Sequence, residues 1–234
     1  METKSIASFY DSFSAKQVKT GVNLRHLLIV NELKKQGLRK NHTVLEVGCG
    51  IGTVSGLLAK YLNKGQLVCA DISPQNIQIA QTRLKQYSNV SFVVSDMQDF
   101  HSDLQFDWVV MPDVLEHIPE DQHAQLFTII KAHLHEQSHL FIHIPAPQYQ
   151  RFLKKARPQD LQIIDQAIDT ARLLQTIAPL GFYLEYLDHY SIYSSEHDYQ
   201  RMVFSLKQEH IQCVMRHQYR IIMRKFLQRL RKRI

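Results

Sequence analysis

Residues 44–53 read VLEVGCGIGT, in which a single acid precedes a turn that contains three glycines. The apolar residues around Glu46 are typical of a short buried strand, and alternate positions after it are Gly48, Gly50 and Gly52. Glycine lets the backbone approach a ligand closely, because it has no Cβ. We therefore predict that a small molecule lies against this turn, in which Glu46 offers a carboxylate and Cys49 is a small residue that fills a turn position.

The carboxylate of Glu46 restricts which molecule this can be. Dinucleotide-binding turns have the spacing G-x-G-x-x-G, whereas residues 48–52 have the spacing G-x-G-x-G. A pyrophosphate would be repelled by a nearby carboxylate, and an ammonium group would be attracted to it. The turn therefore favours a nucleoside that carries an amino-acid group over one that carries phosphates.

Three further polar segments follow strand-like segments farther along the chain. Asp71 ends the second, where its carboxylate could accept hydrogen bonds from the two hydroxyls of a ribose. Residues 95–97 (SDM) end the third and offer a polar group beside an apolar wall, which suits adenine; residues 111–113 (MPD) end the fourth. Because ligands of open parallel sheets bind at the carboxyl ends of the strands, we expect these segments to face one crevice.

Four successive segments, VLEVGCGIGT, VCADIS, SDMQDF and MPDVLEHIP, resemble the motifs of the class I S-adenosylmethionine-dependent methyltransferases in order and spacing. The resemblance covers residues 43–145 and extends more loosely to residue 206. It implies a doubly wound, mostly parallel seven-stranded α/β sheet of the Rossmann-like type, with an antiparallel last strand. It also implies S-adenosylmethionine as the cofactor, with the Glu46–Gly52 turn on the methionine moiety and Asp71 on the ribose. The remaining residues that we assign to the cofactor are Ile72, Asp96, Met97 and Met111.

Residues 113–118, DVLEHI, resemble the small-molecule group of these enzymes. This group includes O- and C-methyltransferases of quinone biosynthesis and many natural-product and sugar methyltransferases. Enzymes that methylate exocyclic amines of adenine or glutamine carry an Asn/Asp-Pro-Pro-aromatic stretch there, which this chain lacks. We therefore expect methyl transfer to a hydroxyl oxygen of a small-molecule, glycan or lipid-linked acceptor. Transfer to a protein or RNA, or to carbon or nitrogen of a small molecule, stays open as an alternative.

His117 is the first candidate for a catalytic base, because it follows the fourth strand on the loop that faces the crevice. An oxygen acceptor with a high pKa benefits from such a base, most often a histidine. His143, near the end of the fifth strand, is the second candidate, and either residue could instead have only a structural role. Asp113, Glu116 and His117 also offer the donor types of a divalent-metal site. Further ligands would have to come from elsewhere, so we assign no metal.

Residues on either side of these motifs are candidates for binding the acceptor. The segment Phe9–Arg25 is expected to close over the donor, so that Tyr10 and Arg25 could contact the methionine carboxylate or the acceptor. The stretch Pro145–Pro158 holds three prolines and is predicted to be irregular, and such loops carry specificity on a fixed scaffold. The side chains there that suit a hydroxylated or anionic acceptor are Gln148, Tyr149, Arg151, Lys154 and Lys155. His189, on the sixth strand, is a further candidate.

Strand-like and helix-like segments alternate along the chain. The predicted strands are His42–Val47, Gln66–Ala70, Val90–Ser95, Trp108–Met111, His139–Ile144, Phe182–Tyr193 and Arg201–Leu206. The predicted helices are Ser14–Gln36, Thr53–Leu62, Pro74–Gln86, Pro119–His135 and Asp160–Ala178. Strands separated by helices predict a mostly parallel sheet with helices on both faces. Only a loop separates the last two strands, which predicts an antiparallel pair at one sheet edge.

We divide the chain into a helical cover (1–41), a methyltransferase domain (42–208) and a basic amphipathic helix (209–234). From residue 210 onward there are eight Lys or Arg and no Asp or Glu, which leaves 20 basic residues against 22 acidic ones elsewhere. Three interpretations of this basic helix stay open. Residues 211–234 could contact an anionic membrane, or their apolar stripe could pack on the domain or on the second subunit of a homodimer. Nucleic acid is the third partner, which the scarcity of aromatic residues there disfavours.

The remaining composition predicts a cytoplasmic protein. The three cysteines have no metal-type spacing and are odd in number, which fits a reducing compartment. No apolar run approaches the ~20 residues of a membrane-spanning helix. The sequence METKSIASFYDSF lacks the basic start and apolar stretch of a signal peptide. We expect a cytoplasmic location, with the basic helix allowing contact with the inner face of a membrane.

Overall fold

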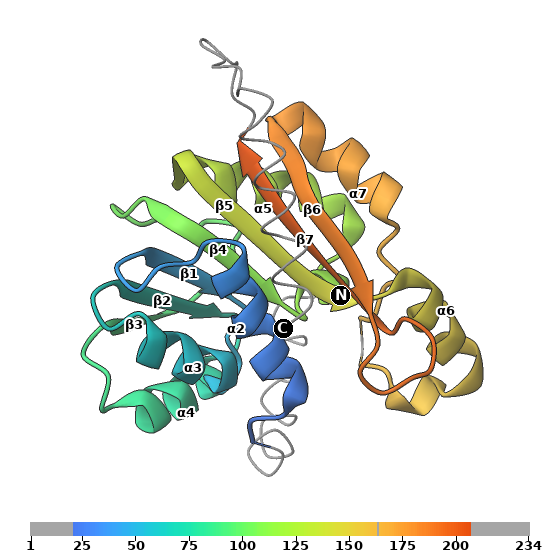
Figure 1. The fold of residues 1–234 in the computed structure, drawn as a ribbon, viewed down its shortest axis with the longest axis horizontal. Helices are drawn as coiled ribbons and strands as arrows, with labels where there is room; N and C mark the ends of the chain where they lie inside the picture. Colours follow the sequence, from blue (N-terminus) through green and yellow to red (C-terminus); the bar gives the residue numbers. More distant parts are fainter. Residues whose placement is uncertain (1–20, 163, 207–234) are drawn as a thin grey trace, which may run out of the picture.

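The computed structural model describes residues 21–162 and 164–206, which form a layered α/β domain around a seven-stranded sheet (Figure 1). The strand order is β3-β2-β1-β4-β5-β7-β6, in which β7 is antiparallel to both neighbours and the other adjacent pairs are parallel. The strands are β1 (Thr43–Val47), β2 (Gln66–Asp71), β3 (Val90–Val94), β4 (Phe106–Pro112), β5 (Leu134–Pro145), β6 (Phe182–Tyr190) and β7 (Tyr199–Leu206). The predicted fold class is confirmed, including the antiparallel pair at the edge.

The connection between β3 and β4 sets the position of the candidate site. The chain builds β1, β2 and β3 outward in one direction and then returns to place β4 on the other side of β1. Glu46 of β1 is therefore paired with Cys69 of β2 on one side and with Val110 of β4 on the other. In open α/β sheets a crevice forms beyond the carboxyl ends of the strands where the order reverses. The residues that follow β1 and β4 stand at that point.

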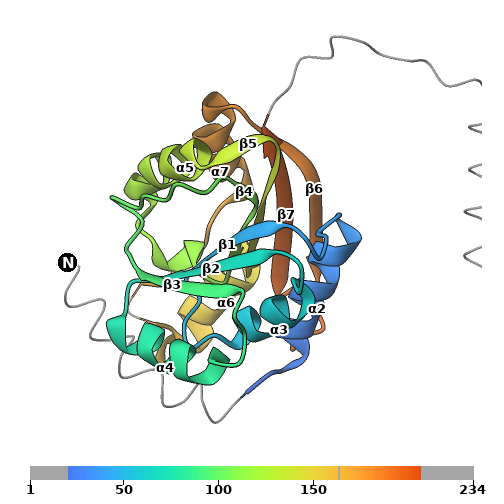
Figure 2. The same cartoon turned by 90° about the vertical axis from the view of Figure 1, so that its left-hand side faces the viewer.

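Helices cover both faces of the sheet. They are α2 (Leu24–Lys35), α3 (Thr53–Tyr61), α4 (Pro74–Leu84), α5 (His123–Ala132), α6 (Pro147–Ala156) and α7 (Thr170–Ile177). Figure 2 shows α2, α3 and α4 on one face and α5 and α7 on the other. Ser73 caps α4, because its Oγ accepts a hydrogen bond of 3.0 Å from the N–H of Asn76, and Pro74 starts the helix.

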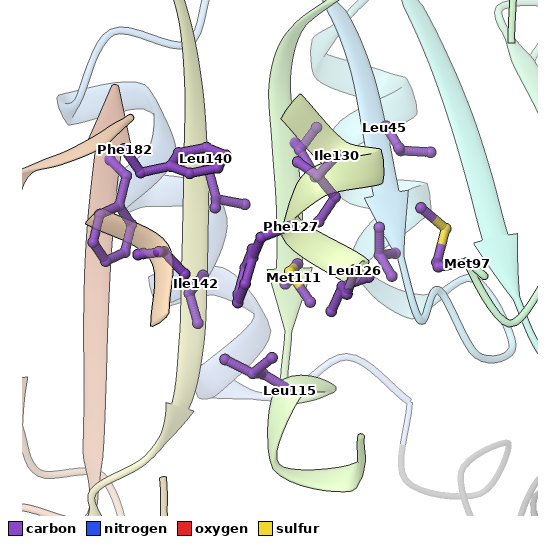
Figure 3. Packing of buried hydrophobic residues seen from close by; sticks show 14 of the residues in the cluster. Leu45, Met97, Met111, Leu115, Leu126, Phe127, Ile130, Leu140, Ile142 and Phe182 are labelled. Carbon is purple, nitrogen blue, oxygen red and sulfur yellow. The ribbon is translucent and has the colours of Figure 1, made fainter. Parts of the chain in front are cut away.

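Two apolar clusters lie on the two faces, because alternate side chains of a strand point to opposite sides. Leu45 belongs to the cluster under α5 and α7, whereas Val44 belongs to the cluster under α2, α3 and α4. Glu46 alternates with Leu45 and so projects toward the α3 face. Figure 3 shows Phe127 of α5 among the buried side chains of the first cluster, beside Met111. Both clusters are close-packed around the strands, so the strand ends present their loops from a rigid base.

The prediction that Pro145–Pro158 is irregular is wrong. Most of the stretch is the helix α6, in which Pro147 occupies a first-turn position that lacks a hydrogen-bonding partner anyway. The residues after it, QYQRFLKKA, are mostly good helix formers, and their propensity outweighs the signal from the flanking prolines. The site therefore has a helix where a loop was expected.

The predicted helix Asp160–Ala178 is also wrong in its first half. The helix α7 begins only at Thr170, after Asp169 caps it by accepting hydrogen bonds from the N–H groups of Ala171 and Arg172. Asp165 likewise accepts a hydrogen bond of 3.0 Å from the N–H of Gln162. Short acidic side chains compete with the helix for backbone donors, so this segment runs as a non-helical strap instead.

Other element boundaries differ by a few residues. The helix predicted at Pro119–His135 begins at His123 after a 3-10 turn, and β5 starts at Leu134 rather than His139. Of the helix predicted at Ser14–Gln36, α2 covers Leu24–Lys35, and residues before 21 lie outside the described part. Within the described residues, no helix is both long and apolar enough to cross a lipid bilayer.

Candidate active site

Two adjoining cavities lie at the carboxyl ends of β1, β2 and β4. The first, of about 360 Å³, is bounded by α2 and α6, and the second, of about 440 Å³, by the residues after β2 and β3. The residues that line both are Gly48, Gly50, Asp113, His117 and Gln162. The glycine turn is therefore the common floor of the two cavities.

The three glycines of this turn all have left-handed backbone conformations, with φ of 70° at Gly48, 53° at Gly50 and 80° at Gly52. An added Cβ at Gly48 would lie 2.4 Å from Cγ2 of Val114, and one at Gly52 would lie 3.0 Å from Cδ1 of Leu84. The turn thus needs glycine for its own conformation and packing. Proximity of a ligand is not the only reason for glycine at these two positions.

Glu46 is the acid beneath this turn. Its side chain lines the first cavity and is 1% exposed, and its Oε1 has no hydrogen-bond partner among the described residues. Burial raises the pKa of Glu46 to about 8, and the carboxylate of Asp71 acts in the same direction. A buried acceptor without a partner costs about 1–3 kcal/mol. An ammonium group in the first cavity would supply both the missing donor and the missing charge.

Asp71 joins the turn to the start of α4. Its Oδ2 accepts a hydrogen bond of 2.7 Å from the N–H of Gly50, and its Oδ1 accepts from the N–H of Ser73 at 2.9 Å and from Nδ2 of Asn76 at 3.2 Å. These bonds fix the second strand end against the glycine turn. Asp71 also lines the second cavity, so the predicted contact with a ribose stays a prediction that its position allows.

The second cavity combines apolar walls with a polar rim. Ile72, Met97 and Ile118 supply apolar surface, and Ser95 and Asp96 supply polar groups. Met97 has φ of 68°, an uncommon conformation for a residue other than glycine, and its N–H donates to Oγ of Ser95 at 2.9 Å. A flat aromatic base with polar edges would match such a lining.

Arg25 and Asp113 form an ion pair that joins α2 to the end of β4. Nε of Arg25 lies 3.2 Å from Oδ2 of Asp113, and both residues line the first cavity. Burial acts to raise the pKa of Asp113, but attraction to Arg25 and His143 outweighs it and holds that pKa below its usual range. Asp113 raises the pKa of Arg25 in turn. The pair is therefore charged on both sides at neutral pH.

His143 lies behind this ion pair. It is fully buried, its Nδ1 lies 2.6 Å from Oδ1 of Asp113, and its Nε2 lies 2.6 Å from the hydroxyl of Tyr190. Its ring stacks on Tyr199, whose hydroxyl accepts a hydrogen bond of 2.8 Å from Nη1 of Arg25. His143 lines neither cavity. This placement favours a role in holding Asp113 over the predicted role as a base.

His117 lies at the junction of the two cavities. Its Nδ1 lies 2.6 Å from the carbonyl oxygen of Ile164, and because a carbonyl can only accept, this nitrogen carries the proton. Burial lowers the pKa of His117, although that carbonyl and Asp165 act to raise it. The ring is therefore neutral at pH 7, and Nε2 is the nitrogen that can accept a proton.

The wall opposite the glycine turn comes from α6 and the strap after it. Tyr149, Gln150 and Leu153 of α6 line the first cavity, and the amide of Gln150 donates a hydrogen bond to Asp165. Arg151 is exposed and pairs with Asp169, and Lys154 and Lys155 are exposed on the same outer side of the helix. The basic residues that suggested an anionic acceptor thus point away from the cavity.

The structure brings most predicted site residues to the two cavities. Those that line at least one of them are Arg25, Glu46, Gly48, Cys49, Gly50, Asp71, Ile72, Asp96, Met97, His117 and Tyr149. Met111 lies elsewhere, in the apolar cluster under α5, and Gln148 is exposed on α6. His189 faces His197 on the sheet edge, with ring centroids 6.3 Å apart. Gly52 begins α3, and Tyr10 is outside the described residues.

Sequence reasoning missed several residues that line the first cavity. The main ones are His26, Gln150, Gln162, Asp165 and Tyr199. Burial lowers the pKa of His26 to about 4, with Arg25 as the next cause, so this histidine is neutral at pH 7. No local signal in the sequence indicates Gln162 and Asp165, which belong to the non-helical residues 161, 162 and 164–169. No group of three or more potential metal ligands is arranged for binding within the ranges that the structure describes.

Known proteins share this domain. The family described as a methyltransferase domain matches residues 44–137. This part of the chain is therefore a methyltransferase domain. Malonyl-[acyl-carrier protein] O-methyltransferase 1 of Ilyobacter polytropus is 27% identical to it over 103 residues, which are 44% of this chain and 36% of that protein. The chain thus matches little more than a third of that relative's length.

Solved structures show the same fold. Magnesium protoporphyrin IX methyltransferase (ChlM) from Synechocystis PCC 6803, with bound S-adenosylhomocysteine, has a TM-score of 0.69 at 18% identity and is covered to 99%, with 88% of this chain. N-methyltransferase NodS from Bradyrhizobium japonicum WM9 has a TM-score of 0.62 at 18% identity and is covered to 95%, with 79% of this chain. These likenesses show a shared fold, and the first of the two structures holds S-adenosylhomocysteine.

The residues that line the two cavities fit S-adenosylmethionine. Glu46 presents an unpartnered carboxyl oxygen to the first cavity, which suits the ammonium of a methionine moiety. Ile72 and Met97 give the second cavity apolar walls beside Asp71, which suits an adenosine. The shared floor at Gly48 and Gly50 connects the two halves. The methionine and adenosine parts would therefore lie in the first and second cavity respectively.

The change Glu46→Gln is expected to weaken the binding of S-adenosylhomocysteine by roughly tenfold to a hundredfold. A hydrogen bond to a charged group contributes about 1.5–3 kcal/mol, and the neutral amide cannot attract an ammonium as a carboxylate does. Isothermal titration calorimetry measures the change. Glu196→Gln, at an exposed position between β6 and β7, is the matched control and should bind like the native protein.

The raised pKa of Glu46 gives this binding a defined pH dependence. Below about pH 8 the empty site holds a proton on Glu46, and that proton must leave before the carboxylate can pair with an ammonium. The affinity of the native protein should fall by up to about tenfold for each pH unit below 8, and Glu46→Gln should lack this slope. A native affinity that is constant from about pH 6 to 8 would show that Glu46 does not hold the ammonium.

Proposed function

We propose that the protein transfers the methyl group of S-adenosylmethionine to a hydroxyl oxygen of a small-molecule acceptor bound in the first cavity. The observation that carries this proposal is His117, a neutral imidazole at the junction of the two cavities. Its Nδ1 donates a hydrogen bond to the carbonyl of Ile164, so Nε2 is the nitrogen that would take a proton from the acceptor. The oxygen of a glycan or lipid-linked compound would satisfy the same chemistry.

The bound cofactor supplies a methyl carbon on a sulfonium, and transfer breaks the carbon–sulfur bond with its electron pair left on sulfur. The acceptor oxygen forms the new bond to that carbon as His117 takes the hydroxyl proton. A base positioned in this way contributes about 10²–10⁴-fold. Alignment of the two reactants in a closed site contributes roughly 7–11 kcal/mol. No covalent bond to the protein is needed.

The ion pair of Arg25 and Asp113 supplies much of that alignment. It fixes α2 against the end of β4, and the hydrogen bond from Arg25 to Tyr199 fixes the same helix against β7. His143 is a positioning residue in this scheme, because it orients the carboxylate of Asp113 without reaching either cavity. The first cavity therefore has walls from α2, α6 and the sheet that are connected through buried polar contacts.

An amine nitrogen is the second candidate acceptor. Four carboxyl groups line the first cavity within the described residues, those of Glu46, Asp113, Glu116 and Asp165, and Arg25 there is already paired with Asp113. An acidic lining suits a substrate that arrives as an ammonium. The similar structure named N-methyltransferase NodS supports the same possibility. Methyl transfer to a protein or an RNA is the rival that the experiment below separates.

The change His117→Ala is expected to lower methyl transfer by about 10²–10⁴-fold, because the acceptor proton loses its base. Labelled S-adenosylmethionine is incubated with the protein and a fractionated cell extract, and label is measured in the small-molecule, lipid, RNA and protein fractions. We expect label in the small-molecule or lipid fraction. The rate of the native protein should fall on the acidic side only below about pH 6.5, since burial lowers the pKa of His117.

His101→Ala is the matched control, because the side chain of His101 is 85% exposed and lines neither cavity. It should leave the rate unchanged. Transfer that persists in His117→Ala at the native rate would remove the assigned base. Label that enters only RNA or protein would contradict the proposed acceptor class.

The basic segment 211–234 lies outside the described residues, and its contact with an anionic membrane surface stays a prediction. Each basic residue near such a surface contributes about 1 kcal/mol, so the full chain should sediment with vesicles that contain phosphatidylserine. A chain truncated after Gln208 should stay in solution. Equal sedimentation of the two chains would show that the segment does not bind the membrane, and binding to RNA in its place would favour the rival acceptor class.

A further inference from the structure

The first cavity contains buried oxygen atoms that lack partners and that the cofactor's ammonium does not account for. Within the described residues, four buried atoms that belong to lining residues have no hydrogen bond: Oε1 of Glu46, Oε2 of Glu116, Oε1 of Gln162 and Nε of Arg25. Nε of Arg25 is compensated by the ion pair with Asp113 at 3.2 Å. Oε1 of Glu46 is assigned above to the cofactor's ammonium, so two oxygens remain, Oε2 of Glu116 and Oε1 of Gln162, and each can accept a hydrogen bond. An acceptor molecule that brings hydrogen-bond donors would satisfy both.

Glu116 is the most constrained of these residues. It is 2% exposed, lines the first cavity and belongs to the 3-10 turn Leu115–His117 that follows β4. Burial raises the pKa of Glu116 well above its usual range, and the nearby carboxylate of Asp113 acts in the same direction. Its Oε1 lies 3.9 Å from Nε2 of His117. The unpartnered Oε2 is thus next to the residue that we assign as the base.

Gln162 is held in place from the opposite wall. Its N–H donates to Oδ2 of Asp165 at 3.0 Å, and Asp165 also accepts a hydrogen bond from the amide of Gln150 on α6. Oδ1 of Asp165 lies 3.9 Å from Nδ1 of His117. Glu116 and Asp165 therefore stand on two sides of His117, and Gln162 is fixed beside them. The strap after α6 places its acceptors around the same ring.

The charged groups that line the first cavity also disfavour an anionic ligand. Arg25 is the one charged cation among the described residues that line it, because burial leaves His26 and His117 neutral at pH 7. Arg25 is already paired with Asp113. A carboxylate or phosphate next to His117 would meet carboxyl groups on both sides and would find no free cation in the described lining.

We infer that Glu116 and Gln162 determine the acceptor, and that they select a small molecule with N–H or O–H donors, an amine or a polyol, next to the methylated atom and reject a carboxylate there. This rests on the proposed function and adds the chemistry of its substrate. An amine and a polyol could both bind here, because each donates hydrogen bonds to oxygen acceptors. An amine is positively charged and a polyol is neutral, and the test distinguishes them by this difference.

The test uses the full chain saturated with S-adenosylhomocysteine and ligand-observed saturation-transfer NMR. The probes are two pairs of equal size, tyramine with 4-hydroxyphenylacetate and glucosamine with glucuronate. We expect the amine of each pair to bind at least about tenfold more tightly than the carboxylate. Methyl glucoside, a neutral polyol, distinguishes hydrogen bonding from charge. If it binds about as tightly as glucosamine, hydroxyl donors account for the preference of the site. If it binds more weakly, the ammonium accounts for that preference.

The change Glu116→Gln, nearly equal in shape, should reduce the preference for the amine by about tenfold, and Gln162→Leu should weaken both amine and polyol. Glu196→Gln, which is exposed and lines neither cavity, is the control. Thermal unfolding of each variant reports separately on the fold. Carboxylates that bind as tightly as their partners, or failure of all the probes to bind at millimolar concentration, would overturn the inference. Calorimetry with S-adenosylhomocysteine tests the proposed function separately. If the native protein does not bind this molecule, the proposed function is wrong, whatever the probes show.

Discussion

A carboxyl group buried under a glycine turn is the constraint on which the site depends. Glu46 sits in the middle of the sheet, between β2 and β4, where burial makes an unpaired charge costly. The empty protein relieves that cost by keeping a proton on the acid, which its raised pKa allows. A ligand with an ammonium group relieves it more fully. Glu46 thus makes the sheet favour a positively charged ligand at the point where its strand order reverses.

The loop after β4 connects this floor to the chemistry above it. Asp113, in a left-handed conformation with φ of 55°, is fixed by His143 from below and by Arg25 from α2. Such a conformation costs energy in a residue other than glycine, and the two partners hold it in place. His117 follows four residues later and reaches both cavities. The buried polar contacts behind Asp113 therefore set the position of the residue that we assign as the base.

The parts of the site that follow directly from parallel strands could be predicted from sequence. Glu46, Asp71 and Met97 each stand at or near the carboxyl end of a strand. In an open parallel sheet these ends lie at the same edge, where ligands bind. Met111 was assigned by the same reasoning, but the alternation of side chains along β4 turns it into the cluster under α5. The sequence thus predicts which strand ends meet more reliably than it predicts the direction in which a side chain points.

The acceptor side could not be predicted in the same way. It depends on α6, whose helical propensity was hidden by flanking prolines, and on the strap before α7, whose acids bind backbone donors. Tyr199 and Arg25 meet although 174 positions separate them in sequence, and no local pattern signals such a contact. His143 was assigned a reactive role because a histidine near a strand end suggests one. Its two ring nitrogens are engaged by Asp113 and Tyr190 instead.

The nature of the ligand above Glu46 can be decided by one competition. The native protein is titrated by calorimetry with S-adenosylhomocysteine, ATP and NADH under identical conditions. The buried acid should make the amino-acid nucleoside bind at least about a hundredfold more tightly than either phosphate-bearing nucleotide, since it attracts the ammonium and repels phosphate. Equal or tighter binding of ATP or NADH would contradict the account.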